Sequence, residues 1–310
     1  MKKVLLSVLL TATASTSQAF AVDKSLKGEV KLDGSSTVFP IAEAAAEEFQ
    51  KEYPNVRVTV GVSGTGGGMK KYTVGEIDIA NASRKMKDEE AKKATENKIE
   101  TIELPIANDG IAVVVNPKNT FVKSLTLTQL KALWEPGSKV KTWKDLDPSF
   151  PADPVKLYGP GADSGTFDFF TEHVMGTARL SRSDYIASED DNVLVTGVSK
   201  DKNALGYFGF AYFVENAKVI RDIPIVGKDG VAITPSAETI EKGTYSLARP
   251  LMIYVNKKSA QRPEVKAFVS FMLKNAGKLS KEVGYVPLKE AIYTDAIKKF
   301  DAAMSGKASH

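Results

Sequence analysis

The stretch that decides the fold is residues 103–116, ELPIANDGIAVVVN, read together with residues 249–256, RPLMIYVN. Both stretches are apolar, have the pattern of extended chain, and are preceded or interrupted by Pro or Gly. About 140 residues separate them, as expected of paired connections between two lobes. We therefore predict that the chain begins in one lobe, crosses to a second lobe and returns, with hinge strands near 105–116 and 249–256.

Around these stretches, short strand-like runs alternate with helical runs, which is typical of α/β proteins. The run Val56–Val62 (VRVTVGV) alternates with a period of two and predicts a strand, whereas 40–51 is an Ala/Glu-rich helix. The other expected elements are strands at 30–32, 77–80, 155–158 and 205–212, and helices at 68–74, 128–134, 166–174 and 263–278. We assign residues 22–107 and 256–310 to lobe one and residues 108–255 to lobe two.

Composition excludes several classes of protein. The 310 residues are 43% hydrophobic and 26% charged, which is globular composition, and a chain of this length favours two lobes over one core. The chain contains no Cys, which excludes thiol catalysis and thiolate metal sites. Two His residues make a multi-imidazole metal site improbable. The net charge of +4, without a Lys/Arg stripe, argues against nucleic-acid binding.

The N-terminus predicts secretion. Met1-Lys2-Lys3 is a charged start, residues 4–10 are apolar, and Ala19-Phe20-Ala21 fits the small-x-small rule for cleavage, so residues 1–21 are expected to be a signal peptide. The apolar run is too short to anchor the protein in a membrane, and no Cys follows it to carry a lipid. We expect a soluble periplasmic protein.

Three strand-to-helix junctions share one pattern of small and hydroxyl-bearing residues, at 34–37 (GSST), 63–68 (SGTGGG) and 163–166 (DSGT). The first N–H groups of a helix lack intrahelical partners, and the helix dipole is positive there, so such a junction can bind an anion. Glycine permits close approach, and Ser or Thr adds a donor. One junction alone is better explained as an N-cap. Three junctions that converge across a cleft would suit a compact oxyanion.

Other chemistries fit the sequence less well. Residues 61–68 lack the Lys-Ser/Thr of a P-loop, and Met69 stands where a dinucleotide-binding fingerprint has its last Gly. A Ser-His-Asp triad would have to use His173, which is more simply an exposed helix residue. Arg84 follows a strand and could hold an oxyanion, or could form a surface ion pair. The acidic run 188–192 could be a carboxylate pair for acid/base or metal chemistry, but a helix N-terminus is the more economical interpretation.

Taken in order, five motifs carry a family likeness: DGSSTVFP (33–40), GVSGTGGGMKK (61–71), IDIANASR (77–84), YGPGADSGTFDFF (158–170) and NALGYFGFAY (203–212). Together they resemble the PstS-like periplasmic phosphate-binding proteins that supply high-affinity phosphate ABC transporters. The resemblance covers nearly all of the mature chain. It implies a two-lobed type II periplasmic-binding-protein fold, of class α/β, with the ligand in a cleft between the lobes.

The resemblance also implies the ligand contacts. They are Thr37 and Val38 with help from Ser36, then Thr65, and then the triplet Ser164, Gly165 and Thr166. Two positions depart from the best-known branch of the family, because Ser83 and Arg84 stand where that branch has an acidic residue and Pro160 stands where it has an arginine.

These departures lead to two hypotheses. Arg84 supplies the missing guanidinium from the other lobe, and Asp163 or Asp109 replaces the acidic residue that selects protonated phosphate over sulfate. We count Ser83 with the site because it stands at the departing position.

The expected function is that of a non-enzymatic receptor, a monomer without cofactor or metal, that binds inorganic phosphate and delivers it to an ABC permease in the inner membrane. Two alternatives stay open. One is a receptor for another tetrahedral oxyanion such as sulfate, arsenate or molybdate. The other is a secreted phosphatase or esterase, against which the shortage of His and of metal-ligand clusters counts.

Overall fold

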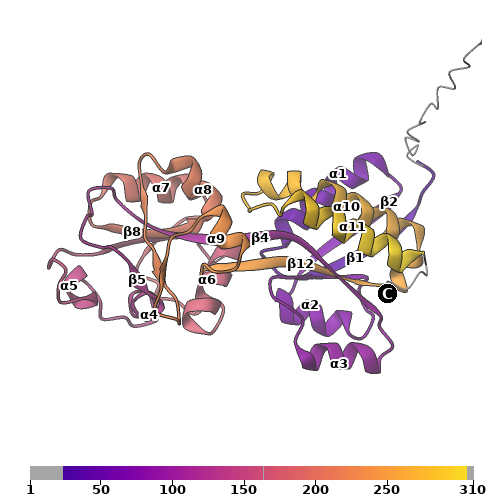
Figure 1. Ribbon diagram of the computed structural model, residues 1–310, viewed down its shortest axis with the longest axis horizontal. Helices are drawn as coiled ribbons and strands as arrows, with labels where there is room; N and C mark the ends of the chain where they lie inside the picture. Colours follow the sequence, from indigo (N-terminus) through magenta and orange to yellow (C-terminus); the bar gives the residue numbers. More distant parts are fainter. Residues whose placement is uncertain (1–23, 163, 306–310) are drawn as a thin grey trace, which may run out of the picture.

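A computed structural model describes residues 24–162 and 164–305 of the protein. The expected signal peptide, residues 1–21, and Asp163 lie outside the described residues. Figure 1 shows two bodies joined by two long strands, β4 (Thr101–Val115) and β12 (Ala248–Asn256). The chain thus has the α/β architecture with two lobes that the sequence predicts.

Strand β4 is shared by both lobes. Its first part, through Gly110, pairs antiparallel with β12, and its last part, from Ile111, pairs antiparallel with β8 (Ala204–Gly209). All its residues from Ile106 onward are buried, which explains why this stretch reads as an almost unbroken apolar run. In the ladder with β12, Asp109 is the direct partner of Arg249.

Lobe one is built on a sheet with the strand order β2-β1-β3-β12-β4. Its other strands are β1 (Gly28–Gly34), β2 (Val56–Val62) and β3 (Ile79–Ala82). The helices α1 (Phe39–Glu52), α10 (Pro263–Glu282) and α11 (Glu290–Met304) pack on one face of this sheet, and α2 (Gly64–Tyr72) and α3 (Asp88–Glu96) lie on the other face (Figure 1). A short 3-10 helix, Ser259–Gln261, joins β12 to α10.

Lobe two continues the sheet in the order β4-β8-β6-β7, and β9 pairs with the end of β4. A second sheet in this lobe has the order β11-β10-β5. The remaining strands are β5 (Leu125–Thr126), β6 (Lys156–Gly159), β7 (Ile186–Ala187), β9 (Arg221–Asp222), β10 (Ile225–Val226) and β11 (Ala232–Ile233). The helices are α4 (Leu127–Trp134), α5 (Trp143–Leu146), α6 (Gly165–Met175), α7 (Asp191–Lys200), α8 (Phe210–Asn216) and α9 (Ala237–Glu241).

The buried apolar side chains form separate cores. The largest cluster takes its members from 30–107 and 251–300, and the second from 111–247. Because Leu251, Ile253 and Val255 belong to the first cluster, the packing of β12 favours a return to lobe one near residues 248–250. The exact domain boundaries remain our proposal.

Some elements differ from the sequence prediction. Helix α2 begins at Gly64 rather than at 68, so the glycines form its first turns instead of a preceding loop. A Cβ on Gly68 would lie 2.6 Å from the Cα of Gly34, so glycine is what lets α2 approach β1 this closely. The stretch 205–212 is not one strand, because β8 ends at Gly209 and α8 begins at Phe210.

Across the part of the chain that the structure describes, no helix is both long enough and apolar enough to cross a membrane.

Candidate functional site

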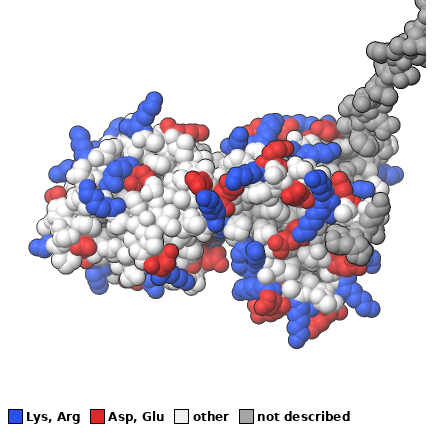
Figure 2. All heavy atoms as spheres, in the orientation of Figure 1, with Lys and Arg blue, Asp and Glu red and all other residues white. Residues whose placement is uncertain are grey.

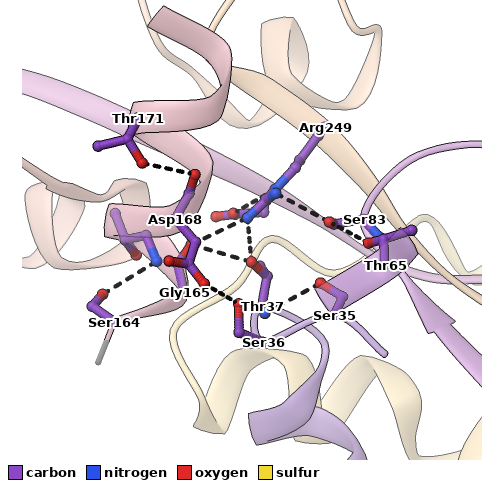
Figure 3. Close-up of polar contacts among 12 residues, drawn as sticks. Ser35, Ser36, Thr37, Thr65, Ser83, Ser164, Gly165, Asp168, Thr171 and Arg249 are labelled. Atoms are coloured by element: carbon purple, nitrogen blue, oxygen red, sulfur yellow. Dashed lines mark hydrogen bonds and ion pairs between the residues drawn. The ribbon is translucent and has the colours of Figure 1, made fainter. Parts of the chain in front are cut away.

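Arg249 is the centre of the polar cluster between the lobes (Figure 3). Its Nε donates to Oδ2 of Asp109 at 3.2 Å, and its Nη1 donates to Oγ of Ser83 at 3.1 Å. Its Nη2 donates to Oγ1 of Thr37 and, at 3.3 Å, to the carbonyl oxygen of Gly165. The guanidinium of Arg249, on β12, therefore contacts both lobes and also Asp109 on the neighbouring strand β4.

The two hinge strands put this pair of charges into the cleft. Arg249 and Asp109 face each other in the β4–β12 ladder, and both side chains are almost fully buried. The guanidinium carbon lies 3.8 Å from the centre of the Phe169 ring, so the aromatic face covers its other side. Burial lowers the pKa of Arg249 and raises the pKa of Asp109, and in each case the partner's charge opposes the shift.

Three helix N-termini surround the guanidinium. Thr37 precedes the N-cap of α1, Thr65 lies in the first turn of α2, and Ser164 is the N-cap of α6. Oγ1 of Thr65 lies 3.1 Å from Oγ of Ser83, and the backbone N–H of Ser83 donates to Oγ1 of Thr65 at 3.2 Å. Oγ1 of Thr37 donates to the carbonyl oxygen of Gly165 at 3.2 Å. The hydroxyl-bearing junctions predicted from the sequence thus do converge.

The backbones of the two lobes approach each other closely at Gly165. A Cβ on this residue would lie 2.9 Å from the Cα of Thr37 and 3.1 Å from the Thr37 nitrogen. A side chain here would push the N-terminus of α6 away from that of α1, so glycine is required for this contact.

The predicted site residues fall into two groups. Thr37, Thr65, Ser83 and Gly165 bond to Arg249 directly or through one another. The others bond elsewhere: Ser36, Val38, Ser164 and Thr166 at their own junctions or across the cleft, and Arg84 within lobe one.

At the first junction, the N–H of Val38 donates to the Ser35 carbonyl at 3.2 Å, and Ser36 bonds across the cleft to Asp168. At the third junction, the hydroxyl of Ser164 accepts from the N–H of Thr166 at 3.2 Å and so caps α6.

Arg84 is not brought to the hydroxyl cluster. Its Nη1 and Nη2 donate to the two carboxylate oxygens of Glu90 at 2.9 and 2.8 Å, which is a bidentate pair on lobe one. The guanidinium among the hydroxyls belongs to Arg249, which sequence reasoning assigned only to a hinge strand. A signal was present, because Asp109 and Arg249 are charged residues in two largely apolar crossing segments, in which Glu103 is the one other charged residue.

A cleft of about 610 Å³ leads from this cluster to the surface. Residues of lobe one, lobe two and the hinge strand line it: Thr65, Ser83, Arg84 and Lys85; Leu127, Phe169, Glu172, His173 and Lys228; Ala248, Arg249 and Pro250. Figure 2 shows the constriction between the two lobes, with basic and acidic side chains on both sides of it. His173 is exposed on α6, as expected from the sequence.

The arrangement suits recognition of a compact anion. It combines a buried guanidinium, several hydroxyls that can donate, and helix N-termini with positive dipoles. Within 24–162 and 164–305, no three His, Asp or Glu side chains are grouped so that they could hold a metal ion.

A family model for the PBP superfamily domain matches residues 12–276. The chain belongs to the PBP superfamily. Two relatives match most of its length. Protein SphX of Synechococcus elongatus is 47% identical over 97% of this chain and 90% of the relative. The phosphate-binding protein PstS of Staphylococcus saprophyticus is 41% identical over 89% of this chain and 85% of the relative.

Solved structures show the same PBP fold. A possible phosphate binding protein from Planctomyces limnophilus superposes with a TM-score of 0.88, at 43% identity over 90% of this chain and 99% of that chain. An ABC-type phosphate transport receptor from Vibrio cholerae has a TM-score of 0.62, at 26% identity over 84% of this chain and 100% of that chain.

Proposed function

We propose that this PBP superfamily protein is a receptor that binds inorganic phosphate between its lobes. The observation that carries the proposal is the buried guanidinium of Arg249, which bonds to hydroxyls or carbonyls of both lobes at the point where three helix N-termini meet. A relative named as a phosphate-binding protein, at 41% identity, supports this ligand. Like its relatives that are named as phosphate-binding proteins, the protein is a binding protein and not an enzyme.

The contacts proposed for phosphate are most of those predicted from the sequence, with Arg249 added. Thr37, Thr65 and Ser83 supply hydroxyls from lobe one. The α6 N-terminus of lobe two supplies Ser164, Gly165 and Thr166. Val38 also belongs to the predicted set, whereas the remaining two predicted residues have other partners: Ser36 bonds to Asp168 and Arg84 bonds to Glu90.

Asp109 is proposed to select phosphate over sulfate. One oxygen, Oδ2, accepts from Arg249, whereas the buried Oδ1 has no hydrogen-bond partner among the described residues. A carboxylate oxygen can accept a hydrogen bond but cannot donate one, so it favours an anion that still carries a proton. Phosphate near neutral pH carries that proton and sulfate does not. An unpaired buried acceptor facing sulfate would weaken sulfate binding.

We further propose that the receptor works as a monomer in the periplasm and delivers phosphate to an ABC permease in the inner membrane. The structural neighbour described as an ABC-type phosphate transport receptor supports this role. The predicted signal peptide supports the location.

Calorimetric titration tests the ligand and the selectivity together. The protein is unfolded and refolded to remove endogenous ligand and is then titrated with phosphate, arsenate, sulfate and molybdate. We expect one-to-one binding of phosphate and arsenate, and sulfate binding weaker by about 100-fold or more. Asp109→Asn should narrow the phosphate-to-sulfate ratio to about tenfold, because an amide can donate to sulfate.

The outcomes separate the alternatives. Equal binding of phosphate and sulfate by the unmodified protein would retain an oxyanion receptor but refute the role of Asp109. Absence of binding to every oxyanion would refute the receptor. Hydrolysis of a chromogenic phosphate ester that is lost in Ser164→Ala would favour the phosphatase alternative.

A further inference from the structure

Asp168 joins the two lobes through a contact that does not involve Arg249. This residue lies in the first turn of α6, and its Oδ2 accepts a hydrogen bond from Oγ of Ser36 at 2.8 Å (Figure 3). Ser36 precedes α1 in lobe one, 132 residues away in the chain. Movement of the lobes apart would break this bond.

Within lobe two, the carboxylate is already anchored. Nε of Arg179 donates to the other oxygen, Oδ1, at 3.0 Å. The side chain of Asp168 is 18% exposed, so the ion pair is partly shielded from solvent, whereas Arg179 is more open at 59%. The acceptor for Ser36 is therefore held in place by groups of its own lobe.

The backbone of Arg179 is fixed in an unusual conformation. Its φ of 66° is in the left-handed region, which costs free energy for a residue with a side chain. The N–H of Arg179 donates to Oγ1 of Thr171 at 2.8 Å, and Oγ1 of Thr171 donates to the carbonyl oxygen of Phe167 at 2.7 Å. These bonds tie the loop that carries Arg179 to α6, which keeps the guanidinium beside Asp168.

Both carboxylate oxygens of Asp168 accept hydrogen bonds from protein donors, so neither is free to accept from a protonated oxyanion, unlike Oδ1 of Asp109. The same carboxylate is well placed to accept from Ser36, whose hydroxyl is a neutral donor. A hydrogen bond to a charged group is also stronger than one between neutral groups.

We propose that Ser36 and Asp168, with Arg179 as anchor, form an interlobe clasp that stabilises the closed receptor and slows the release of phosphate. The inference rests on the proposed function, and it gives Ser36 a role different from the direct phosphate contact predicted from the sequence. Asp168 is a positioning residue, because it acts on the ligand only through Ser36 and the closed arrangement of the lobes.

Ser36→Ala, Asp168→Asn and the double variant test the clasp. Stopped-flow release of phosphate should be about tenfold faster in either single variant, which is the effect of losing one charge-assisted hydrogen bond. The double variant should be no faster than the singles, because both remove the same interaction. Ser149→Ala is the matched control, since Oγ of Ser149 donates to Oδ1 of Asp147 at 2.7 Å within one loop of lobe two.

A second readout follows closure itself. The chain has no Cys, so Lys92→Cys on α3 and Lys200→Cys on α7 provide one labelling position on each lobe for single-molecule energy transfer. The closed fraction of the ligand-free protein should fall in both clasp variants and should not change in Ser149→Ala.

Two results would overturn the clasp. Faster release in Ser36→Ala with unchanged release in Asp168→Asn would mean that Ser36 contacts phosphate itself. An unchanged closed fraction in both variants would show that the bond does not hold the lobes together. If the unmodified protein fails to bind phosphate, the proposed function fails, and the ligand-free closed fraction still decides the clasp.

Discussion

The cleft contains two arginines with different partners. Arg84 is paired with Glu90 on lobe one, whereas Arg249 contacts Asp109, Thr37, Ser83 and Gly165. Arg249→Ala should weaken phosphate binding by at least about 100-fold, because a buried charged donor is lost and Asp109 is left unpaired. Arg84→Ala should change the dissociation constant less than about threefold. Calorimetry on both variants measures the difference.

Arg249→Lys separates charge from geometry. Lysine keeps the positive charge but cannot reach several acceptors at once in a planar fork, so we expect a clear loss of affinity in this variant as well. Thermal melting of each variant shows whether it is folded. If Arg84→Ala lost more affinity for phosphate than a folded Arg249→Lys variant, Arg84 would be the arginine that binds phosphate, as first predicted from the sequence.

The site was only partly predictable from the sequence at this scale. Thr37 and Thr65 stand in local hydroxyl and glycine motifs, which are visible within a few residues of chain. Arg249 has no such motif, and its place depends on a ladder partner, Asp109, 140 residues away. Register of this kind comes from the pairing of β4 with β12, so a charge in an apolar stretch can mark Arg249 but cannot reveal its partner.

At the scale of elements, α7 begins at an acidic cluster. Asp190 is its N-cap and Asp191 its first residue, which confirms that the acidic run 188–192 is a helix start. Burial, together with repulsion from Asp190 and Glu189, raises the pKa of Asp191 from 3.8 to about 6. The folded protein therefore binds a proton between about pH 4 and pH 6 that the unfolded chain does not bind.

This shift makes the free energy of unfolding fall as the pH rises from about 4 to about 6. Asp191→Asn removes the cost of the crowded charge, and we expect it to raise the free energy of unfolding by about 2 kcal/mol at pH 7. The gain should disappear below about pH 4, where aspartate is protonated in both states. Urea unfolding over this pH range measures it.

Asp295→Asn, at an exposed position on α11, is the control for the substitution itself. If Asp191→Asn raised the free energy of unfolding equally at pH 4 and pH 7, the electrostatic explanation would be contradicted.

Helices and strands whose apolar residues recur with a clear period were predicted well. Val56–Val62 is the strand β2 with the predicted bounds, and α1 differs from its prediction by one residue at each end. The exceptions have tertiary causes. Glycine is a poor helix former, so α2 was placed too late, yet Gly68 is needed where the helix meets β1. The aromatic run after Gly209 has strand character but continues as α8.

At the scale of the whole molecule, the two crossing strands explain both the lobes and the cleft. They were predicted because their apolar runs are long, and β4 is confirmed as one strand of 15 residues. The charge of the cleft was not predictable, because it depends on which surface loops face each other across it. The rim brings together Lys85 of lobe one with His173 and Lys228 of lobe two, and Glu172 is the acidic residue beside them.

This rim should accelerate the capture of phosphate. Lys85 and Lys228 are exposed, and neither ammonium group has an ion-pair partner within 24–162 and 164–305. Basic groups on both sides of an entrance attract an anion from solution, an effect that acts on the association rate and is screened by salt. Lys85→Gln combined with Lys228→Gln should slow association several-fold at about 10 mM salt and leave the dissociation rate unchanged.

Stopped-flow association across a range of ionic strength measures this effect, with Lys274→Gln on α10, away from the cleft, as the matched control. The difference between the double variant and the unmodified protein should shrink towards zero near 1 M salt, where the screening length is about 3 Å. A slowing that persists at high salt would show that the lysines shape the closed site rather than guide the anion to it. An unchanged association rate at low salt would mean that the Asp and Glu side chains around the rim cancel their field.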